Sequence, residues 1–154
     1  MFKIFKFNKP EILYPKYDAE VKWAFMKGVD IIINGEVYLR RLMILKCPWF
    51  SIYLHKFFKG DEDLCGHNHP FCFYTVILTH GYKEEVDGEV FFRKPRRIYY
   101  RPAEWTHRVI LNENDPKPLT LVLTGPKVQE WGFFTKNGFV HWKDFKENRE
   151  SHLC

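Results

Sequence analysis

Three histidines of this sequence have a spacing that suits the binding of a metal ion. His67 and His69 lie two positions apart, and His107 lies in a later segment, Arg101–His107. On an extended strand, side chains at positions i and i+2 point to the same face, so two imidazoles can bind one ion. Neutral imidazole is a ligand for iron, zinc, nickel, copper and manganese. We therefore expect His67, His69 and His107 to meet and to bind one divalent metal ion.

A set of three protein ligands leaves coordination positions open, and catalytic metal ions need such positions. The same segment offers a second hypothesis, a closed zinc site built from Cys65, His67, His69 and Cys72. Closed zinc sites usually draw two pairs of ligands from separate segments of the chain. The spacing therefore favours the three-histidine site over the zinc site.

Strands must position these histidines, because the sequence from Val37 to Trp142 shows no helical periodicity. Short runs rich in aromatic and β-branched residues alternate with turn signals such as Asn34-Gly35, Asp87-Gly88 and Asn137-Gly138. This pattern is typical of a jelly-roll sandwich or barrel. The predicted strands cover residues 37–46, 49–58, 71–80, 82–86, 89–93, 97–101, 107–111, 119–124, 131–135 and 139–142.

The remaining segments are assigned by local signals. Asp18 is a candidate N-cap, and Gly28 is a candidate terminator, so we predict a short N-terminal helix over residues 19–27. The polar tail, residues 143–154, is expected to be a short helix or a frayed end. The sequence contains no repeat or linker, so we predict a single domain over residues 1–154, with a barrel core over about 37–142.

Charge and composition narrow the classes of partner. The net charge is +5, with acidic residues interspersed among the basic ones, and the short basic cluster Lys94–Arg97 fits a solvated loop. We expect no nucleic-acid partner and no membrane partner, because no segment has the roughly 18 apolar residues of a membrane helix. The absence of a secretory signal in the given sequence predicts a cytoplasmic protein with reduced cysteines.

The two histidine segments resemble the two motifs of the cupin superfamily. The first motif has His-x-His and a later turn glycine, which His67, His69 and Gly81 match. The second motif has Pro-x-Gly-x-x-His, which Pro102–His107 matches in spacing, with Glu104 at the usual glycine position. The resemblance spans about residues 37–124. It implies an all-β, cupin-type jelly-roll β-barrel with a metal centre.

One departure from the cupin pattern makes the sequence resemble a particular group of cupins. The glutamate ligand of the family falls at Phe73 or Tyr74, and neither side chain is a carboxylate. The remaining three-histidine set is similar to that of the thiol dioxygenases, of which cysteine dioxygenase is a member. That likeness implies Fe(II) as the metal, with zinc, nickel and manganese as alternatives, since imidazole binds all of them. It also implies a mononuclear non-haem iron oxygenase that acts on a small molecule, for instance a thiol.

The same likeness suggests catalytic residues. Tyr74 stands where the thiol dioxygenases carry a cysteine beside the metal. Arg40 and Arg41 lie on an earlier strand, where that family places an arginine for the substrate carboxylate. A guanidinium binds carboxylates in a bidentate manner, so either arginine is a candidate and Arg41 is the one we select. His141, on a late aromatic strand, is a further candidate for the pocket. We therefore predict Tyr74, Arg41 and His141 as catalytic residues.

A different class of function uses the same fold. Many cupins are not oxygenases, so the alternative hypothesis is a non-catalytic cupin that binds a small anionic or sugar-like ligand. The expected partner is a small molecule in either case. A homodimer is a further expectation, because exposed edge strands of a sheet invite pairing between copies.

Overall fold

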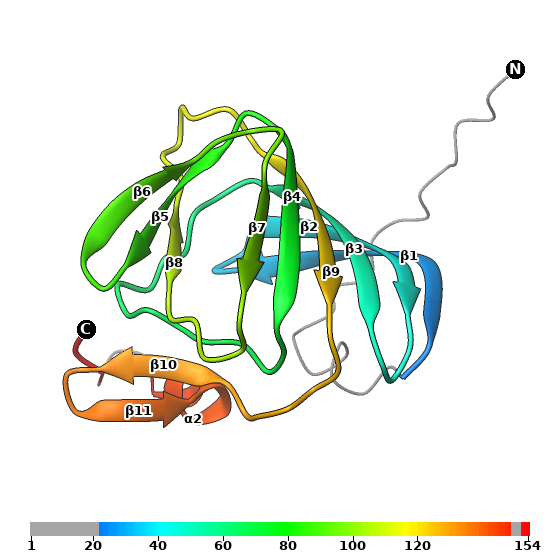
Figure 1. The fold of residues 1–154 in the computed structure, drawn as a ribbon. Coiled ribbons are helices and arrows are strands. Elements are labelled where there is room, and N and C mark those ends of the chain that lie inside the picture. Colours follow the sequence, from blue (N-terminus) through cyan, green and yellow to red (C-terminus); the bar gives the residue numbers. More distant parts are fainter. Residues whose placement is uncertain (1–21, 149–151) are drawn as a thin grey trace, which may run out of the picture.

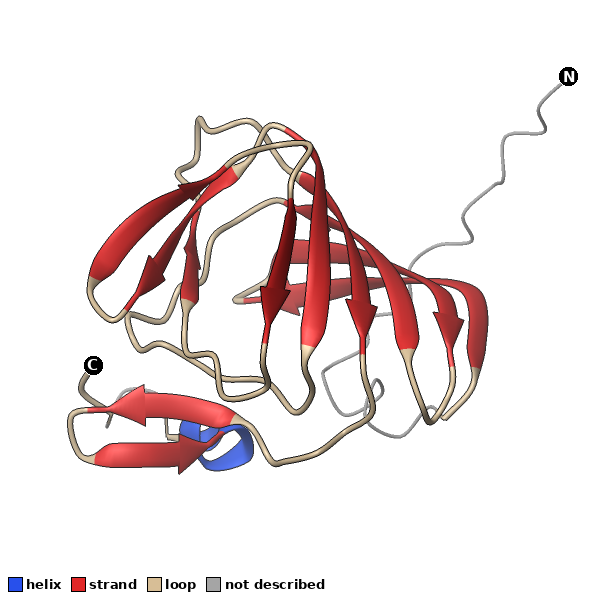
Figure 2. Ribbon diagram, in the orientation of Figure 1, coloured by secondary structure: helices blue, strands red, loops and turns tan. Residues whose placement is uncertain are grey.

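The computed structural model describes residues 22–148 and 152–154, and this part of the chain is mainly β-structure (Figure 1 and Figure 2). A short helix, α2 (Trp142–Glu147), follows the last strand. The strands are β1 Ala24–Ile33, β2 Glu36–Lys46, β3 Ser51–Phe57, β4 Phe73–Thr79, β5 Tyr82–Val86, β6 Glu89–Arg93, β7 Ile98–Arg101, β8 Arg108–Ile110, β9 Leu119–Thr124, β10 Gly132–Thr135 and β11 Gly138–His141. Each predicted strand is therefore present, with ends that shift by one or two residues.

The strands form three antiparallel sheets. One has six strands in the order β1-β2-β3-β9-β4-β7, a second has the order β6-β5-β8, and the third is the hairpin β10-β11. Figure 1 shows the hairpin and α2 together at one end of the two larger sheets. The hydrogen bonds thus give a jelly-roll arrangement of separate sheets, where we had expected one closed barrel.

Tight turns set the register of the hairpins, as the sequence predicts. Asn34 and Gly35 have φ values of 52° and 80°, and Asp87 and Gly88 have the same pair of values. Two successive residues with positive φ are the signature of the type I′ turn, whose twist matches that of the flanking strands. Both predicted hairpins, β1–β2 and β5–β6, are confirmed.

The inner face of the six-stranded sheet carries the core. Successive side chains of a strand point to opposite faces, so buried residues alternate with half-buried or exposed ones along β3, β4 and β9. A second cluster lies where the three-stranded sheet packs on this face, and a third lies beneath the β10–β11 hairpin. The three clusters comprise Val29, Met43, Tyr53, Phe73 and Val122; Ile77, Tyr82 and Val109; and Cys65, Phe133 and Phe145.

The N-terminal helix predicted over residues 19–27 is wrong for the part that the structure describes. Residues 24–27 belong to β1, where Ala24 pairs with Lys46 and Lys27 pairs with Met43 of β2. Residues 19–21 lie outside the described part. Pairing along a long neighbouring strand outweighs a local capping signal, because a helix of this length is marginal by itself. The helix of the described part, α2, instead lies in the polar tail.

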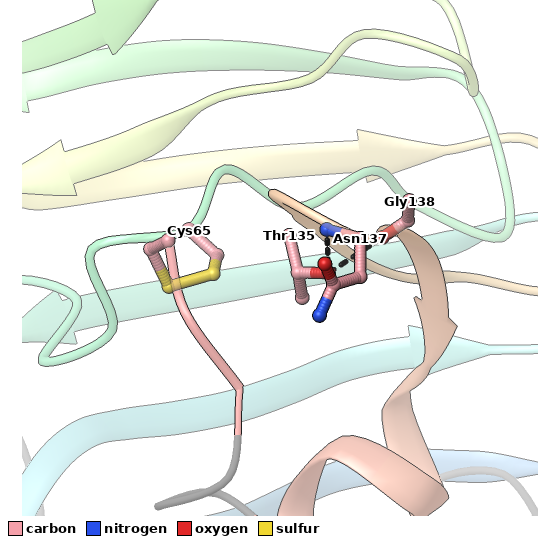
Figure 3. Close-up of a disulfide and its surroundings, with 5 residues drawn as sticks. Cys65, Thr135, Asn137 and Gly138 are labelled. Atoms are coloured by element: carbon pink, nitrogen blue, oxygen red, sulfur yellow. Dashed lines mark hydrogen bonds between the residues drawn. A yellow bond between two sulfur atoms is a disulfide. The ribbon is translucent and has the colours of Figure 1, made fainter.

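A disulfide joins Cys65 to Cys154 (Figure 3). The two cysteines are 89 positions apart, and their Cα atoms lie 4.7 Å apart. The prediction of reduced cysteines is therefore wrong for this pair, while Cys47 and Cys72 are free thiols. The bond also rules out the zinc site, because it occupies the Cys65 sulfur.

The turn between β10 and β11 lies close to this disulfide. The Thr135 hydroxyl donates a hydrogen bond to the Gly138 carbonyl over 2.9 Å and accepts one from the Asn137 backbone N–H over 3.2 Å (Figure 3). These bonds support the predicted Asn137-Gly138 turn. Over residues 22–148 and 152–154, we find no helix with the length and apolar content to cross a membrane.

Candidate metal centre

The three predicted histidines meet at one point of the structure. The imidazole centroids of His67, His69 and His107 form a nearly equilateral triangle with sides of 5.0–5.1 Å. One ring nitrogen from each histidine lies within 4.8 Å of the other two. Nε2 of His69 and Nε2 of His107 are 2.8 Å apart. The three side chains therefore converge as the sequence predicts.

Backbone hydrogen bonds outside the regular strands bring His67 and His107 together. The His67 N–H donates to the His107 carbonyl over 2.9 Å, and the His107 N–H donates back to the His67 carbonyl over 3.0 Å. These bonds form an isolated antiparallel bridge, which also includes Phe133. His67 and His69 thus lie in an extended loop between β3 and β4, whereas the sequence argument had placed them on a strand.

The loop that carries His67 and His69 is fixed by the segment that follows β9. The Gln129 side chain donates to the carbonyls of His69 and Ala103, over 2.8 and 2.9 Å. The Gly132 N–H donates to the buried Asn68 side chain over 2.9 Å. Hydrogen bonds at Asn68 and His69 therefore hold the loop against Gln129 and Gly132.

Gly132 illustrates how closely the C-terminal hairpin is packed. A Cβ atom at this position would lie 2.1 Å from the Val140 carbonyl oxygen, closer than any real contact. Only glycine lets β10 and β11 pair at this point, next to the strand residue Phe133, whose ring centroid lies 5.7 Å from that of His67. The hairpin thus forms one wall of the histidine site.

Aromatic rings make up the surroundings of the site. The Phe73 centroid lies 4.6 Å from that of His69, and the Trp131 centroid lies 6.3 Å from that of His67. Trp131 stacks in turn on Trp142 at 5.7 Å, so β4, the β10 segment and α2 each contribute a ring. Such walls lower the local polarity and strengthen electrostatic interactions inside the site.

A buried carboxylate supports His107 from behind. Glu84 of β5 has no exposed surface, and its Oε1 atom is hydrogen-bonded to Nδ1 of His107. With the proton on Nδ1, the opposite nitrogen of His107, Nε2, presents a lone pair toward His69. A carboxylate in this position fixes both the tautomer and the ring orientation of a metal-binding histidine.

Two arginines hold the Glu84 carboxylate in place. Nε and Nη2 of Arg101 donate to its two oxygens over 2.7 and 2.9 Å, and Nε of Arg93 donates to the second oxygen. Burial would raise the pKa of Glu84, but the hydrogen bonds from His107 and Arg101 outweigh it and hold that pKa well below its usual range. Glu84 is therefore an anion that contacts the back of His107 and is directed away from the ligand face.

The other two histidines are neutral near pH 7. Burial lowers the pKa of His67 to about 4, although Oδ2 of Asp61 lies 4.0 Å from its Nδ1 and opposes the shift. Burial, and then the neighbouring His107 and His67, lower the pKa of His69 well below its ordinary value. Metal ions bind the unprotonated imidazole, so both rings are in the form that a metal ion needs.

Two of the three donors, on His69 and His107, are spaced as ligands of one divalent transition-metal ion would be. Two imidazole nitrogens at right angles around an ion, each at about 2.0–2.1 Å, are separated by about 2.8–3.0 Å. The observed separation of 2.8 Å between the Nε2 atoms of His69 and His107 falls in this range. His67, His69 and His107 would therefore hold the ion, with Glu84 behind them.

Of the three predicted catalytic residues, Arg41 points into the interior. It pairs with His55 across β2 and β3, its Nε donates to Nε2 of His55 over 2.9 Å, and its guanidinium lies 4.8 Å from the Tyr53 ring centroid. Arg41 is also among the charges that lower the pKa of His69. Its placement on the inner face is compatible with contact to a ligand.

Tyr74 and His141 are not brought to the three histidines. Tyr74 is exposed on the outer face of β4, where its ring lies 4.9 Å from that of Tyr100. Its neighbour Phe73 faces the histidines, so the alternation along the strand directs Tyr74 away from them. His141 caps α2 and bonds Glu130 over 3.0 Å. The structure therefore corrects the placement that we had expected for both residues.

Sequence reasoning missed Glu84, although a signal for it exists. In the strand Tyr82–Val86, residues 82 and 84 share a face, and the bulky Tyr82 marks that face as the inner one. A glutamate on an inward position is costly unless it is paired, which points to a functional or structural partner. Only the fold shows that this partner includes His107, since β5 and β8 pair side by side.

Comparisons with known proteins were made by sequence and by structure. No protein-family model matches the sequence, and no curated protein matches it. Solved structures do match the fold. A cupin-2 domain from Rhodospirillum rubrum superposes with a TM-score of 0.55 and 11% identity, covering 94% of this chain and 90% of that one. The fold is that of the cupins.

Further cupin-fold structures agree. An RmlC-like cupin from Shewanella frigidimarina has a TM-score of 0.50 and 16% identity, covering 71% of this chain and 97% of that one. A candidate mannose-6-phosphate isomerase from Ralstonia eutropha has a TM-score of 0.51 and 14% identity, covering 62% and 91% of the two chains. At these identities the likeness shows the cupin fold and leaves the activity to be argued from the site.

Proposed function

We propose that this cupin-fold protein is a metal-dependent enzyme whose centre is formed by His67, His69 and His107. The observation that carries the proposal is the convergence of three imidazoles, in which Nε2 of His69 and Nε2 of His107 are 2.8 Å apart and the buried Glu84 carboxylate bonds Nδ1 of His107. The proposed metal is Fe(II), and zinc, nickel and manganese are the alternatives. The proposed activity is that of a mononuclear non-haem iron oxygenase acting on a small molecule.

The donor set supports an oxygenase with an anionic substrate. Fe(II) held by His67, His69 and His107 would supply open coordination positions for a substrate and for dioxygen. Three neutral imidazoles add no negative charge to the centre, so the set favours an anionic substrate group such as a thiolate. The rings of Phe73, Trp131 and Phe133 line the histidine site with apolar surface.

The residues of the chain have separate tasks in this proposal. Glu84 holds the proton on Nδ1 of His107, and this leaves Nε2 as the ligand. Arg41, on the inner face of β2, is the proposed contact for a substrate carboxylate, because its guanidinium matches the geometry of that group. Tyr74 has no role here, since its side chain lies on the outer face.

Oxygen consumption by protein loaded with Fe(II) tests the proposal. We expect uptake with a small thiol that carries a carboxylate, loss of uptake after chelation, and at least a tenfold rise in KM for Arg41→Met. Lys56→Met is the matched control, because Lys56 is exposed on the next strand. Ligand binding that survives chelation, with no turnover of any substrate, would instead support the non-catalytic cupin.

A further inference from the structure

The disulfide between Cys65 and Cys154 lies next to the histidine site in the sequence. His67 follows Cys65 by two positions, in the loop between β3 and β4, which we call the histidine loop. In the part of the chain that the structure describes, this bond is the one covalent link between the histidine loop and a distant segment. A change in the redox state of this bond therefore acts close to a predicted metal ligand.

The segment at the other end of the disulfide, residues 152–154, contacts the C-terminal hairpin and α2. The Lys136 N–H, in the β10–β11 turn, donates a hydrogen bond to the Leu153 carbonyl over 2.9 Å. The His152 ring stacks on the ring of Phe145 in α2, with centroids 5.2 Å apart and an angle of 12° between the planes. Through the disulfide, this segment thus connects the hairpin and α2 to the histidine loop.

The packing beneath the hairpin extends this connection to His67. Cys65 is 2% exposed and packs in one cluster with Phe133 of β10 and Phe145 of α2. The rings of Phe133 and Phe145 stack with centroids 4.0 Å apart, and Phe133 forms a backbone bridge with His67. The disulfide therefore closes a ring of contacts that runs through the hairpin, α2 and the histidine loop.

The two sulfur atoms of the disulfide differ in access to solvent. Cys154 is exposed, whereas Cys65 is buried. Thiol–disulfide exchange begins with the attack of a thiolate on a disulfide sulfur, and its rate depends on access to that sulfur. A reductant would therefore attack Cys154. Exposed disulfides are also the ones that are more easily reduced and that serve in regulation.

Reduction by a dithiol balances in two steps. The first thiolate of the reductant forms a mixed disulfide with Cys154 and releases the sulfur of Cys65. The second thiol of the reductant then breaks the mixed disulfide, and the reductant leaves as its own disulfide. The two electrons and two protons lost by the dithiol are found on Cys65 and Cys154, which both end as thiols.

We propose that the Cys65–Cys154 disulfide is a redox switch of the metal centre, and that its reduction lowers the affinity of the three histidines for a metal ion. This inference rests on the metal centre proposed above. Without the covalent restraint, the histidine loop opens locally more often, while the sheets remain folded. A ligand set that is in place for a smaller fraction of the time binds the ion more weakly in proportion.

The coupling between the disulfide and the metal ion acts in both directions. If reduction weakens metal binding by a given factor, bound metal makes the disulfide harder to reduce by the same factor. We therefore expect Zn²⁺ to shift the thiol–disulfide equilibrium with a dithiol buffer toward the disulfide. The size of this shift is expected to equal the ratio of the metal affinities of the two redox states.

Metal affinity of the full chain in both redox states tests the switch. Wild type would be reduced with dithiothreitol, separated from it by anaerobic gel filtration and titrated with Zn²⁺ against a chromophoric chelator. We expect the dissociation constant to rise by about fivefold or more on reduction and to return on reoxidation. Cys154→Ser and Cys65→Ser are expected to match reduced wild type and to be insensitive to dithiothreitol. Cys72→Ser, which removes a free thiol, is the control and should respond as wild type does.

Hydrogen exchange and circular dichroism separate a local effect from a global one. On reduction, amides of residues 65–69 are expected to exchange faster, while those of β3 and β9 are unchanged. A reduced protein or Cys154→Ser variant that unfolds as a whole overturns the switch, because the bond would then stabilise the entire fold.

The remaining outcomes also decide the question. Equal Zn²⁺ affinities in the two redox states overturn the switch and leave the metal centre intact. No binding by oxidised wild type overturns the centre and the switch together. Tighter binding by reduced wild type than by Cys65→Ser would show that the Cys65 thiol is itself a ligand, which also overturns the switch.

Discussion

Glu84 and His107 are hydrogen-bonded in the interior, between the carboxylate of β5 and Nδ1 of the third histidine. Glu84 is fully buried, and His107 is buried as well. The carboxylate lies on the side of the ring opposite Nε2, which faces His69. The buried carboxylate therefore sets the orientation of the His107 ring, whose Nε2 atom would bind a metal ion.

The contribution of Glu84 can be measured as metal affinity. Glu84→Gln keeps the size of the side chain but removes its charge, so the ligand nitrogen of His107 becomes less basic. Replacing such a partner typically lowers metal affinity about 10–100-fold. Competition with a chromophoric chelator, using Zn²⁺ or Co²⁺ as the probe, gives the affinity of each variant.

Glu85→Gln is the matched control for this measurement. Glu85 is the next residue of the same strand, bonds Arg108 and is not in contact with the histidines. Equal metal affinities for the two variants would show that Glu84 only stabilises the fold. Loss of folding in Glu84→Gln would be visible in the thermal melt, and Glu84→Asp would then provide the comparison.

Stability is predicted to fall as the pH is lowered from 7 to 5 in the presence of a chelator. The pKa of His67 is about 4 in the folded protein and about 6.5 in the unfolded chain, so the unfolded chain binds more protons in this window. His67 alone then lowers the free energy of unfolding by about 2 kcal/mol between pH 7 and pH 5. Burial also lowers the pKa of His55 and His69, which adds to the effect.

Urea unfolding at a series of pH values checks the direction of this change. Glu84 does not oppose it, because its lowered pKa lies below this window. A free energy of unfolding that stayed constant or rose toward pH 5 would show that the histidines are not buried in the neutral form. Added Zn²⁺ is expected to raise stability at pH 7 more than at pH 5, since protons compete for the same nitrogens.

The strands and the histidine set are the parts of this structure that the sequence predicts well. Asn34-Gly35 and Asp87-Gly88 adopt positive φ, which few other residue pairs tolerate, so the hairpins follow from local chemistry. His67, His69 and His107 are recognisable because few other residue types bind transition metals. These signals are contained in short segments and do not depend on how distant elements pack.

The errors concern relations between distant segments. Residues 24–27 form part of β1 because β2 lies beside them, a contact that no local signal reveals. The partner of Cys65 is 89 positions away, and cysteine spacing alone does not determine pairing. Tyr74 was assigned to the site by resemblance, yet the phase of β4 directs Phe73 inward instead. Glu84 needed the pairing of β5 with β8 to be recognised.

The disulfide provides a further prediction, about the stability of the folded protein. Cys65 is two positions before His67, and its bond to Cys154 closes a loop of 89 residues. Cys154→Ser is expected to lower the free energy of unfolding by about 2–4 kcal/mol, because the unfolded chain regains conformational freedom. Denaturant titration under oxidising conditions measures the change.

Cys72→Ser is the control for the disulfide, since Cys72 is a free thiol. It is expected to change the free energy of unfolding far less than Cys154→Ser does. If a reductant left the stability of the wild-type protein unchanged, the bond would contribute nothing to the fold.

The metal content of the purified protein tests the central claim most directly. We would reconstitute wild type, His107→Ala and His80→Ala with Fe(II) under anaerobic conditions and measure their iron content by elemental analysis. His107 is one of the three converging histidines. His80, on the β4–β5 turn, is the control. We predict close to one iron per chain in wild type and His80→Ala, and its loss in His107→Ala. No metal in folded wild type, or equal metal in all three proteins, would contradict a centre formed by His67, His69 and His107.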